Sequence, residues 1–212
     1  MDRADNHSHA SNTTSETIAT RVAQATGTSV LNCYQCGRCA AGCMQNVSGE
    51  MDISPTRMMR LLQLESAFAE DTAQAAGYAK RALGADTPWL CAGCLACTTR
   101  CPQGVDIAGT MDVLRQEALK RGAASRSKRA KDAQALHKSF LHAALSNGQV
   151  HELSMMIEYK LRTGHLVEDA MLGAAMFFKG KLHLKPHKGP GTDRVRGAIA
   201  KLKQQHDNGG GK

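Results

Sequence analysis

Cysteine is the residue type in this chain whose spacing most clearly predicts chemistry. The eight cysteines fall into two groups, CYQCGRCAAGC and CAGCLACTTRCP, and both have the spacing C-x2-C-x2-C-x3-C. They are Cys33, Cys36, Cys39 and Cys43 in the first group, and Cys91, Cys94, Cys97 and Cys101 in the second. Thiolates at this spacing hold [4Fe–4S] clusters, so a motif that occurs twice predicts two clusters.

Disulfides and structural zinc are the alternative uses of so many cysteines. The N-terminal segment has no apolar core of the kind found in secretory signals, so we expect a cytoplasmic chain whose thiols stay reduced. No apolar run approaches the length of a membrane span. Zinc usually takes two C-x2-C pairs. A third and a fourth closely spaced cysteine are superfluous for zinc, which favours iron–sulfur clusters.

The fourth cysteine of each group is expected to ligate the cluster of the other group. The short spacers let three thiolates of one group bind one face of a cluster. The fourth cysteine of the group is placed too far around to bind the same cluster, and it binds the cluster of the other group. The expected ligand sets are Cys33, Cys36, Cys39 and Cys101 for one cluster, and Cys91, Cys94, Cys97 and Cys43 for the other. Four thiolates leave no iron open to a substrate. We therefore expect single-electron transfer and no catalytic residue.

The elements that position the cysteines are expected to be helices. Ser54 followed by Pro55 predicts a helix start. A second helix is predicted from Asp71 to Leu83, and Asp106 is expected to cap a third. These helices occupy or follow the 47 residues between the cysteine groups, an insert too long for a compact βαββαβ ferredoxin. We expect an all-α fold, an α-helical two-cluster ferredoxin domain with a C-terminal helical extension.

The sequence divides into four predicted regions. They are a flexible N-terminal tail (1–27), the ferredoxin domain (28–122), a helical docking extension (123–185) and a basic C-terminal tail (186–212). The extension opens with a basic linker over 123–131, and apolar stripes then predict helices near 136–148, 153–164 and 166–180. Met155, Met156, Met171 and Met176 are expected to fill its core, and His183 and His187 to be solvated.

The basic composition predicts little about nucleic acids. The formal net charge is +8, but eight thiolates and two oxidised cluster cores lower it to about +4. Aromatic residues make up only 4% of the chain, which leaves few side chains for base stacking. We therefore expect protein partners and no nucleic acid.

Several segments together resemble the C-type subunit of heterodisulfide reductase. They are both cysteine groups, DISPTRMMRLLQLE after the first, QGVDI after the second, and the later HELSMMIEYKLRTG and FFKGKLHLKPHKG. The resemblance spans residues 28–204, and every cysteine matches the family pattern. One departure is Met44, which follows the first group where proline is common; it affects the turn after Cys43 and no ligand.

The resemblance implies a subunit that carries electrons within a larger complex. In this family, the C-type subunit connects an A-type subunit, which holds flavin and iron–sulfur clusters, with a B-type subunit, whose Cys-Cys-Gly motifs handle the disulfide. Those motifs are absent from this sequence, so no substrate site is expected in this member of an oxidoreductase complex acting on sulfur compounds. Similar complexes serve methanogens and sulfur-oxidising bacteria, and the Ala- and Gly-rich composition favours the second setting.

Two other functions remain open from the sequence. One is the iron–sulfur subunit of another respiratory or dehydrogenase complex, of the fumarate reductase or anaerobic glycerol-phosphate type. Such subunits usually carry a further [2Fe–2S] domain or Cys-Cys-Gly repeats. The other is a redox-sensing interaction protein, but sensors usually hold one exposed cluster, whereas two fully ligated clusters favour electron transfer.

Overall fold

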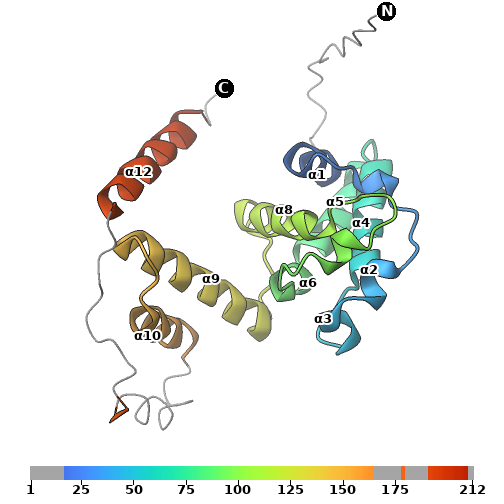
Figure 1. The fold of residues 1–212 in the computed structure, drawn as a ribbon. Coiled ribbons are helices and arrows are strands. Elements are labelled where there is room, and N and C mark those ends of the chain that lie inside the picture. The colour runs from blue at the N-terminus through green and yellow to red at the C-terminus, as the bar shows by residue number, and fades with distance from the viewer. Residues whose placement is uncertain (1–16, 165–177, 180–190, 210–212) are drawn as a thin grey trace, which may run out of the picture. The chain divides into compact units, whose positions relative to one another are not determined.

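The computed structural model describes residues 17–164, 178–179 and 191–209, and this part of the chain contains helices and no strand (Figure 1). The expected all-α fold is therefore confirmed. The chain divides into two compact units, one ending at Ser127 and the other starting at Lys128, and each is described by itself. None of the helices within the described ranges has both the length and the apolarity that crossing a membrane requires.

The described part of the first unit, residues 17–127, contains nine helical elements. They are α1 (Ile18–Thr26), the 3-10 turn η1 (Val30–Asn32), α2 (Arg38–Ala41), α3 (Met44–Val47), α4 (Pro55–Ala67), α5 (Thr72–Leu83), α6 (Thr87–Leu90), α7 (Ala96–Thr99) and α8 (Ile107–Lys120). The order of these elements repeats. Each half contains, in this order, a helix, a short helical turn, a cysteine loop with a short helix, and a long helix. These elements are α1, η1, α2 and α4 in the first half, and α5, α6, α7 and α8 in the second.

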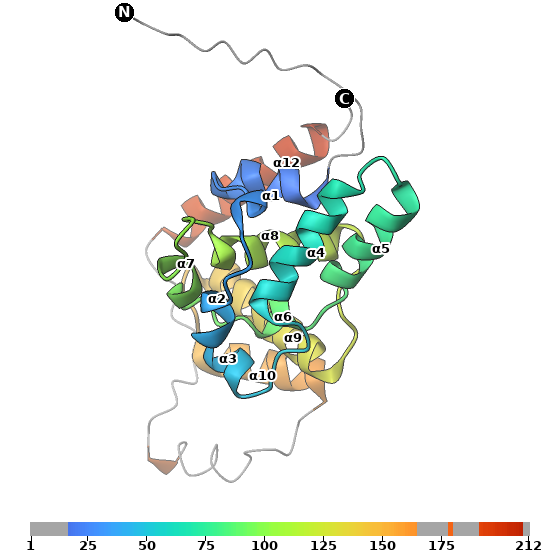
Figure 2. The same ribbon diagram turned by 90° about the vertical axis from the view of Figure 1, so that its right-hand side faces the viewer.

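The two halves of this repeat interlock instead of standing apart. Helix α1 of the first half packs on α8 of the second half, and α5 of the second half packs on α4 of the first. The short helices α2 and α7, which follow the two cysteine loops, also contact each other (Figure 2). The two cysteine groups are consequently held side by side by helices from both ends of the unit.

The core of the first unit is built from the long helices. Met58 and Leu62 of α4 and Met111 and Leu114 of α8 are almost completely buried. Methionine fills irregular gaps between helices well because its side chain is flexible and polarisable. Burial of each such side chain contributes about 1.5–3 kcal/mol, so the long helices form the frame that supports the cysteine loops.

The predicted starts of the three helices near the cysteines are confirmed. The side chain of Ser54 accepts a hydrogen bond from the backbone of α4, with Pro55 in its first turn. Asp71 caps α5, which ends at Leu83 as predicted, and Asp106 caps α8. Each side chain satisfies a backbone N–H that has no partner within its own helix.

The prediction of a flexible tail over 1–27 is wrong for its last part, because residues 18–26 form α1. Ile18 and Val22 are fully buried, and the carboxylate of Glu65 accepts hydrogen bonds from the backbone N–H of Ile18 (2.8 Å) and of Ala19 (3.3 Å). A distant acidic side chain therefore caps this helix, together with Thr17. Residues 1–16 lie outside the described residues.

The second unit contains α9 (Lys128–Asn147), α10 (Glu152–Thr163) and α12 (Thr192–Gly209), and both α10 and α12 pack on α9. His142 of α9 and Arg162 of α10 both contact the carboxylate of Glu158, each at 2.6 Å. The guanidinium of Arg196 donates to the backbone carbonyl oxygen of Ser146 at 2.7 Å. Polar contacts therefore supplement packing in this unit.

Several boundaries in the second unit differ from the sequence predictions. Helix α9 starts at Lys128, inside the predicted linker over 123–131, and α12 lies inside the predicted basic tail. Met156 is 45% exposed and does not fill a core. The predicted helix near 166–177 and the predictions for Met171, Met176, His183 and His187 lie outside the described residues.

Candidate metal centre

Each cysteine loop is introduced by a short turn that ends on its first cysteine. Cys33 caps the C-terminus of η1, and Cys91 caps the C-terminus of α6. The third cysteine of each group then lies in the following short helix, Cys39 in α2 and Cys97 in α7. The repeated spacing in the sequence therefore corresponds to a repeated local structure.

The two loops also share an uncommon backbone conformation. The second and fourth residues after the first cysteine have positive φ in both loops: Gln35 (65°) and Gly37 (79°) in one, Gly93 (65°) and Leu95 (62°) in the other. Glycine adopts this left-handed region freely, whereas Gln and Leu are strained there. Each loop thus has one glycine and one strained residue, in opposite order, and both wind in the same way.

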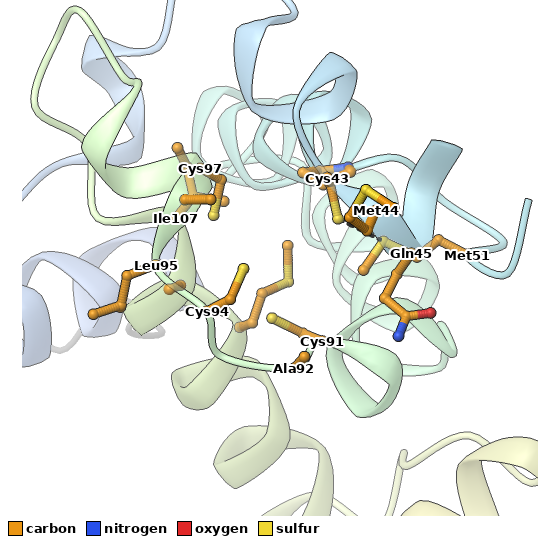
Figure 3. A pocket seen from close by; sticks show the side chains of 14 residues that line it. Cys43, Met44, Gln45, Met51, Cys91, Ala92, Cys94, Leu95, Cys97 and Ile107 are labelled. Atoms are coloured by element: carbon orange, nitrogen blue, oxygen red, sulfur yellow. Dashed lines mark hydrogen bonds between the residues drawn. The ribbon is translucent and has the colours of Figure 1, made fainter. Parts of the chain in front are cut away.

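Four sulfur atoms from the two groups surround one cavity of about 180 Å³. Cys91, Cys94 and Cys97 line it together with Cys43 of the other group, and their sulfur atoms point toward the same space in Figure 3. The rest of its lining is largely apolar and includes Met44, Met51, Leu95, Ile107, Ala108 and Met111. The structure therefore brings together all four members of one predicted ligand set.

The members of the other predicted set are also neighbours. Burial raises the pKa of the Cys33 thiol, the backbone N–H of Gln35 lowers it, and the nearby thiols of Cys39, Cys101 and Cys36 raise it further. Among these neighbours, Cys101 comes from the second cysteine group. Burial likewise raises the pKa of Cys97, next to Cys91. The anionic forms of the free Cys33 and Cys97 thiols are therefore disfavoured, and a bound cation would stabilise these thiolates.

Contact between α2 and α7 brings the fourth cysteines across. Gly42, which precedes Cys43, lies directly against the guanidinium of Arg100, which precedes Cys101. A Cβ atom at position 42 would overlap that side chain. The overlapping atoms belong to the end of a flexible side chain, so a larger residue at position 42 would displace the guanidinium of Arg100.

Two polar residues that the sequence did not single out hold the cysteine loops in place. The amide Nε2 of Gln63 in α4 donates to the carbonyl oxygens of Val30 (3.1 Å) and Cys33 (2.6 Å). The guanidinium of Arg115 in α8 donates to the carbonyl oxygens of Pro88 (2.5 Å) and Cys91 (2.6 Å). Hydrogen bonds of this kind, made behind the ligands themselves, fix the orientation of metal ligands.

The donor set fits iron–sulfur clusters. All eight cysteines are free thiols, and thiolates are the ligands that such clusters require. Within the residues that the structure describes, no three His, Cys, Asp or Glu side chains stand close enough to hold one metal ion. The cysteines instead stand around a wider space.

Comparison with known proteins assigns the domain. Residues 29–105 match the 4Fe-4S dicluster domain family. The chain is 36% identical over 95 residues to the C-type iron–sulfur subunit of CoB–CoM heterodisulfide reductase from Methanopyrus kandleri, covering 44% of this chain and 42% of that protein. A second C-type subunit, from Methanocaldococcus jannaschii, is 30% identical over 125 residues, with coverages of 59% and 58%.

The C-type subunit of the ferredoxin:CoB-CoM heterodisulfide reductase from Methanosarcina mazei is 28% identical over 102 residues, with coverages of 48% and 54%. The chain therefore spans about half the length of the curated relatives it matches. These matches confirm the resemblance found in the sequence and the cofactor expected from it. The domain binds two [4Fe–4S] clusters through a helical dicluster fold.

Proposed function

We propose that this chain, whose dicluster domain is similar to the C-type iron–sulfur subunits of heterodisulfide reductase, is the electron-transfer subunit of a heterodisulfide reductase-like complex. It relays electrons between an A-type partner with flavin and iron–sulfur clusters and a disulfide-active B-type partner. The observation that carries this proposal is the cavity shared by Cys43 and the second cysteine group. With four cysteines around each site, no iron is left open to a substrate.

The proposal includes the ligands of both clusters. We assign cluster 1 to Cys33, Cys36, Cys39 and Cys101, and cluster 2 to Cys91, Cys94, Cys97 and Cys43. The shared cavity supports the second set, and the proximity of Cys101 to Cys33 supports the first. Each cluster would then supply one-electron chemistry. The chain keeps the thiolates and the carbonyl groups behind them in place, and it sets the distance between the two clusters.

The second unit is proposed as the docking extension of this protein. Residues 1–127 contain as many basic as acidic residues, so the whole formal net charge of +8 belongs to residues 128–212. On α9 and α10, Phe140, Leu141, Ile157 and Leu161 are all more than half exposed. A surface that combines exposed apolar side chains with positive charge suits a partner protein that is acidic at the rim of its interface.

We further place the complex in the cytoplasm and in sulfur oxidation, with the Ala- and Gly-rich composition as support. In this setting electrons would leave reduced sulfur compounds as these are oxidised, the reverse of the direction in which a disulfide is reduced. The identity of the co-purifying subunits and the source of the sulfur compound would decide between this setting and the methanogenic one.

Anaerobic purification of the tagged full chain from its own cells tests the proposal. We expect a flavoprotein and a protein with Cys-Cys-Gly motifs to co-purify in fixed proportion, identified by mass spectrometry. We also expect the chain's reduced clusters to be oxidised by the rest of the complex. A chain that stays a monomer and passes electrons only to generic acceptors would overturn the proposal.

A further inference from the structure

The two halves of the dicluster domain can be compared residue by residue. In the cysteine loops, each position recurs 58 residues later, as from Cys33 to Cys91. In the helices that follow, the offset is 52, because Gln63 and Arg115 donate to the same two carbonyl positions of their loops. Differences between equivalent positions therefore report differences between the surroundings of the two clusters.

Two cysteines assigned to cluster 1 have polar side chains next to their sulfur atoms, and the equivalent positions in the other half carry no donor side chain. The hydroxyl of Thr56 lies 3.3 Å from Sγ of Cys39, and Nε2 of Gln35 donates to Sγ of Cys33 at 3.4 Å. Once the sulfur is a thiolate bound to iron, the threonine hydroxyl must be the donor. The equivalent positions near cluster 2 are Ala108 and Gly93, whose side chains cannot donate.

A hydroxyl does lie next to a ligand of cluster 2. Burial raises the pKa of the Cys97 thiol, and the side chain and backbone N–H of Thr98 act against this rise, but the hydroxyl proton of Thr98 is directed at another acceptor. Thr98 follows Cys97, and its Oγ1 donates to the carboxylate of Asp106 at 2.9 Å. A hydroxyl has a single proton to donate. The cavity around cluster 2 is otherwise lined mainly by methionine, isoleucine, leucine and alanine side chains, so its sulfur atoms meet mainly apolar neighbours.

Charges at equivalent positions differ in the same direction. Arg38 precedes Cys39 where Ala96 precedes Cys97, and Arg100 precedes Cys101 where Gly42 precedes Cys43. Arg38 precedes a ligand assigned to cluster 1, whereas the guanidinium of Arg100 lies against Gly42, next to Cys43 of cluster 2, so Arg38 is the charge that distinguishes the two sites.

The charges on the long helices behind the loops also differ between the two halves. The guanidinium of Arg115 near cluster 2 forms an ion pair with Asp112 at 2.6 Å. In the first half Arg60 takes the place of Asp112 and donates to neutral Gln63 at 3.3 Å. Positive charge is thus compensated by this carboxylate behind cluster 2, whereas the equivalent position behind cluster 1 is itself cationic.

We infer that Thr56 and Gln35 poise cluster 1 at a more positive reduction potential than cluster 2, so that an electron entering at cluster 2 moves to cluster 1. Reduction adds one negative charge to a cluster, and donors or cations close to its sulfur atoms stabilise that charge. The electron lost by reduced cluster 2 is the one gained by oxidised cluster 1. This inference rests on the proposed function and deepens it by giving the order of the two carriers.

Reciprocal substitutions in the full chain, followed by redox titration with EPR detection, test the inference. Thr56→Val removes the hydroxyl and should lower the higher of the two potentials, while the lower one stays. A change of about tenfold in the one-electron equilibrium constant, equal to about 59 mV, is expected. Ala108→Thr introduces a hydroxyl near Cys97 and should raise the lower potential. The matched control is Thr56→Ser, which keeps the hydroxyl and both potentials.

Ala108 is almost completely buried, so Gly93→Gln provides a second test at cluster 2, at the cost of the left-handed backbone strain that Gln35 already bears in the other loop. Position 93 has the same positive φ as Gln35 and open space beside it. Gly93→Gln should raise the lower potential, and Gln35→Gly should lower the higher one. If Thr56→Val and Gln35→Gly moved the lower potential, or moved neither, the assigned order would be overturned.

The readout separates this inference from the proposed function. Iron and acid-labile sulfide are measured first on the unaltered chain. If the chain holds two clusters whose reduction potentials do not change on substitution of Thr56 or Gln35, the proposed order of the carriers is refuted. The electron-transfer role would not be affected by that result. A chain without two clusters, or one whose clusters exchange electrons with no partner protein, would refute the proposed function itself.

Discussion

Gln63 and Arg115 make the same pair of hydrogen bonds in the two halves of the dicluster domain. Each donates to the carbonyl oxygen of the first cysteine of its loop and to the carbonyl three residues earlier. A neutral amide does this in one half and a guanidinium in the other. Both fix the start of a cysteine loop to a long helix of the core.

The first prediction concerns this attachment. Arg115→Met should lower the free energy of unfolding by about 1.5–3 kcal/mol, because loss of the charged donor leaves two carbonyls without their hydrogen bonds. Cluster 2 should also lose iron to a chelator faster than cluster 1. Iron release and thermal unfolding measure the effect. Arg57→Met is the control, since Arg57 is exposed on α4; equal effects of both changes would contradict the prediction.

The second prediction tests the crossed ligands. Cys43→Ala should damage cluster 2, although Cys43 belongs to the first cysteine group. Cys101→Ala should damage cluster 1 in the same way. EPR spectra and iron content of both variants distinguish the clusters. Loss of the cluster held by Cys33 in the Cys43 variant, with the other cluster intact, would show that each group serves its own cluster.

The third prediction concerns backbone strain. Leu95 has a positive φ and its side chain is 56% exposed. Leu95→Gly should therefore raise the free energy of unfolding by about 0.5–1 kcal/mol, the relief of left-handed strain less the added entropy of the unfolded chain. Gly93→Ala, at the other left-handed position of the loop, should lower it by a similar amount. Chemical denaturation under anaerobic conditions measures both, and a stabilising Gly93→Ala would contradict the interpretation.

The fourth prediction concerns two buried carboxylates at equivalent positions of α4 and α8. Burial raises the pKa of Glu65, although the backbone N–H groups of Ile18 and Ala19 act against this rise. Burial also acts on Glu117, but Arg21, Lys120 and Arg121 lower its pKa below the ordinary value. The pKa of a buried glutamate is therefore raised in one half of the domain and lowered in the other.

Their effects on stability have opposite signs. The contribution of Glu65 is complete below the pKa of an unfolded glutamate, about 4.3, and is lost as the pH rises through the raised folded value. Stability of Glu65→Gln relative to the unaltered chain should hence increase as the pH rises above about 4.3, and should level off once the pH has passed the raised folded pKa of Glu65. Glu117→Gln is the control, because Glu117 stays ionised over this range and its effect should not vary with pH. Thermal unfolding at several pH values measures both, and parallel profiles would refute the assignment.

The sequence predicted those features that depend on neighbouring residues. Ser54, Asp71 and Asp106 cap helices because each side chain reaches a backbone N–H three residues further on. The cysteine spacing likewise encodes the local winding of each loop. Such features need no knowledge of the tertiary fold.

Features that depend on distant residues could not be predicted in this way. Helix α1 is short, and its N-terminus is completed by Glu65, which lies in α4. Gln63 and Arg115 are ordinary polar residues of helices in the sequence, and only the fold shows which carbonyls they reach. Likewise, α9 starts within a run of charged residues, and no apolar pattern marks its first turn.

The reciprocal packing of α1 on α8 and of α5 on α4 has a consequence for biosynthesis. While the chain emerges from the ribosome, the first cysteine group is exposed long before Cys101 and α8 have been made. The early thiols then have neither their last proposed ligand nor the helix that covers α1. We therefore expect cluster insertion to follow translation of the whole domain, and a nascent chain truncated before α8 to accept no stable cluster from the assembly machinery.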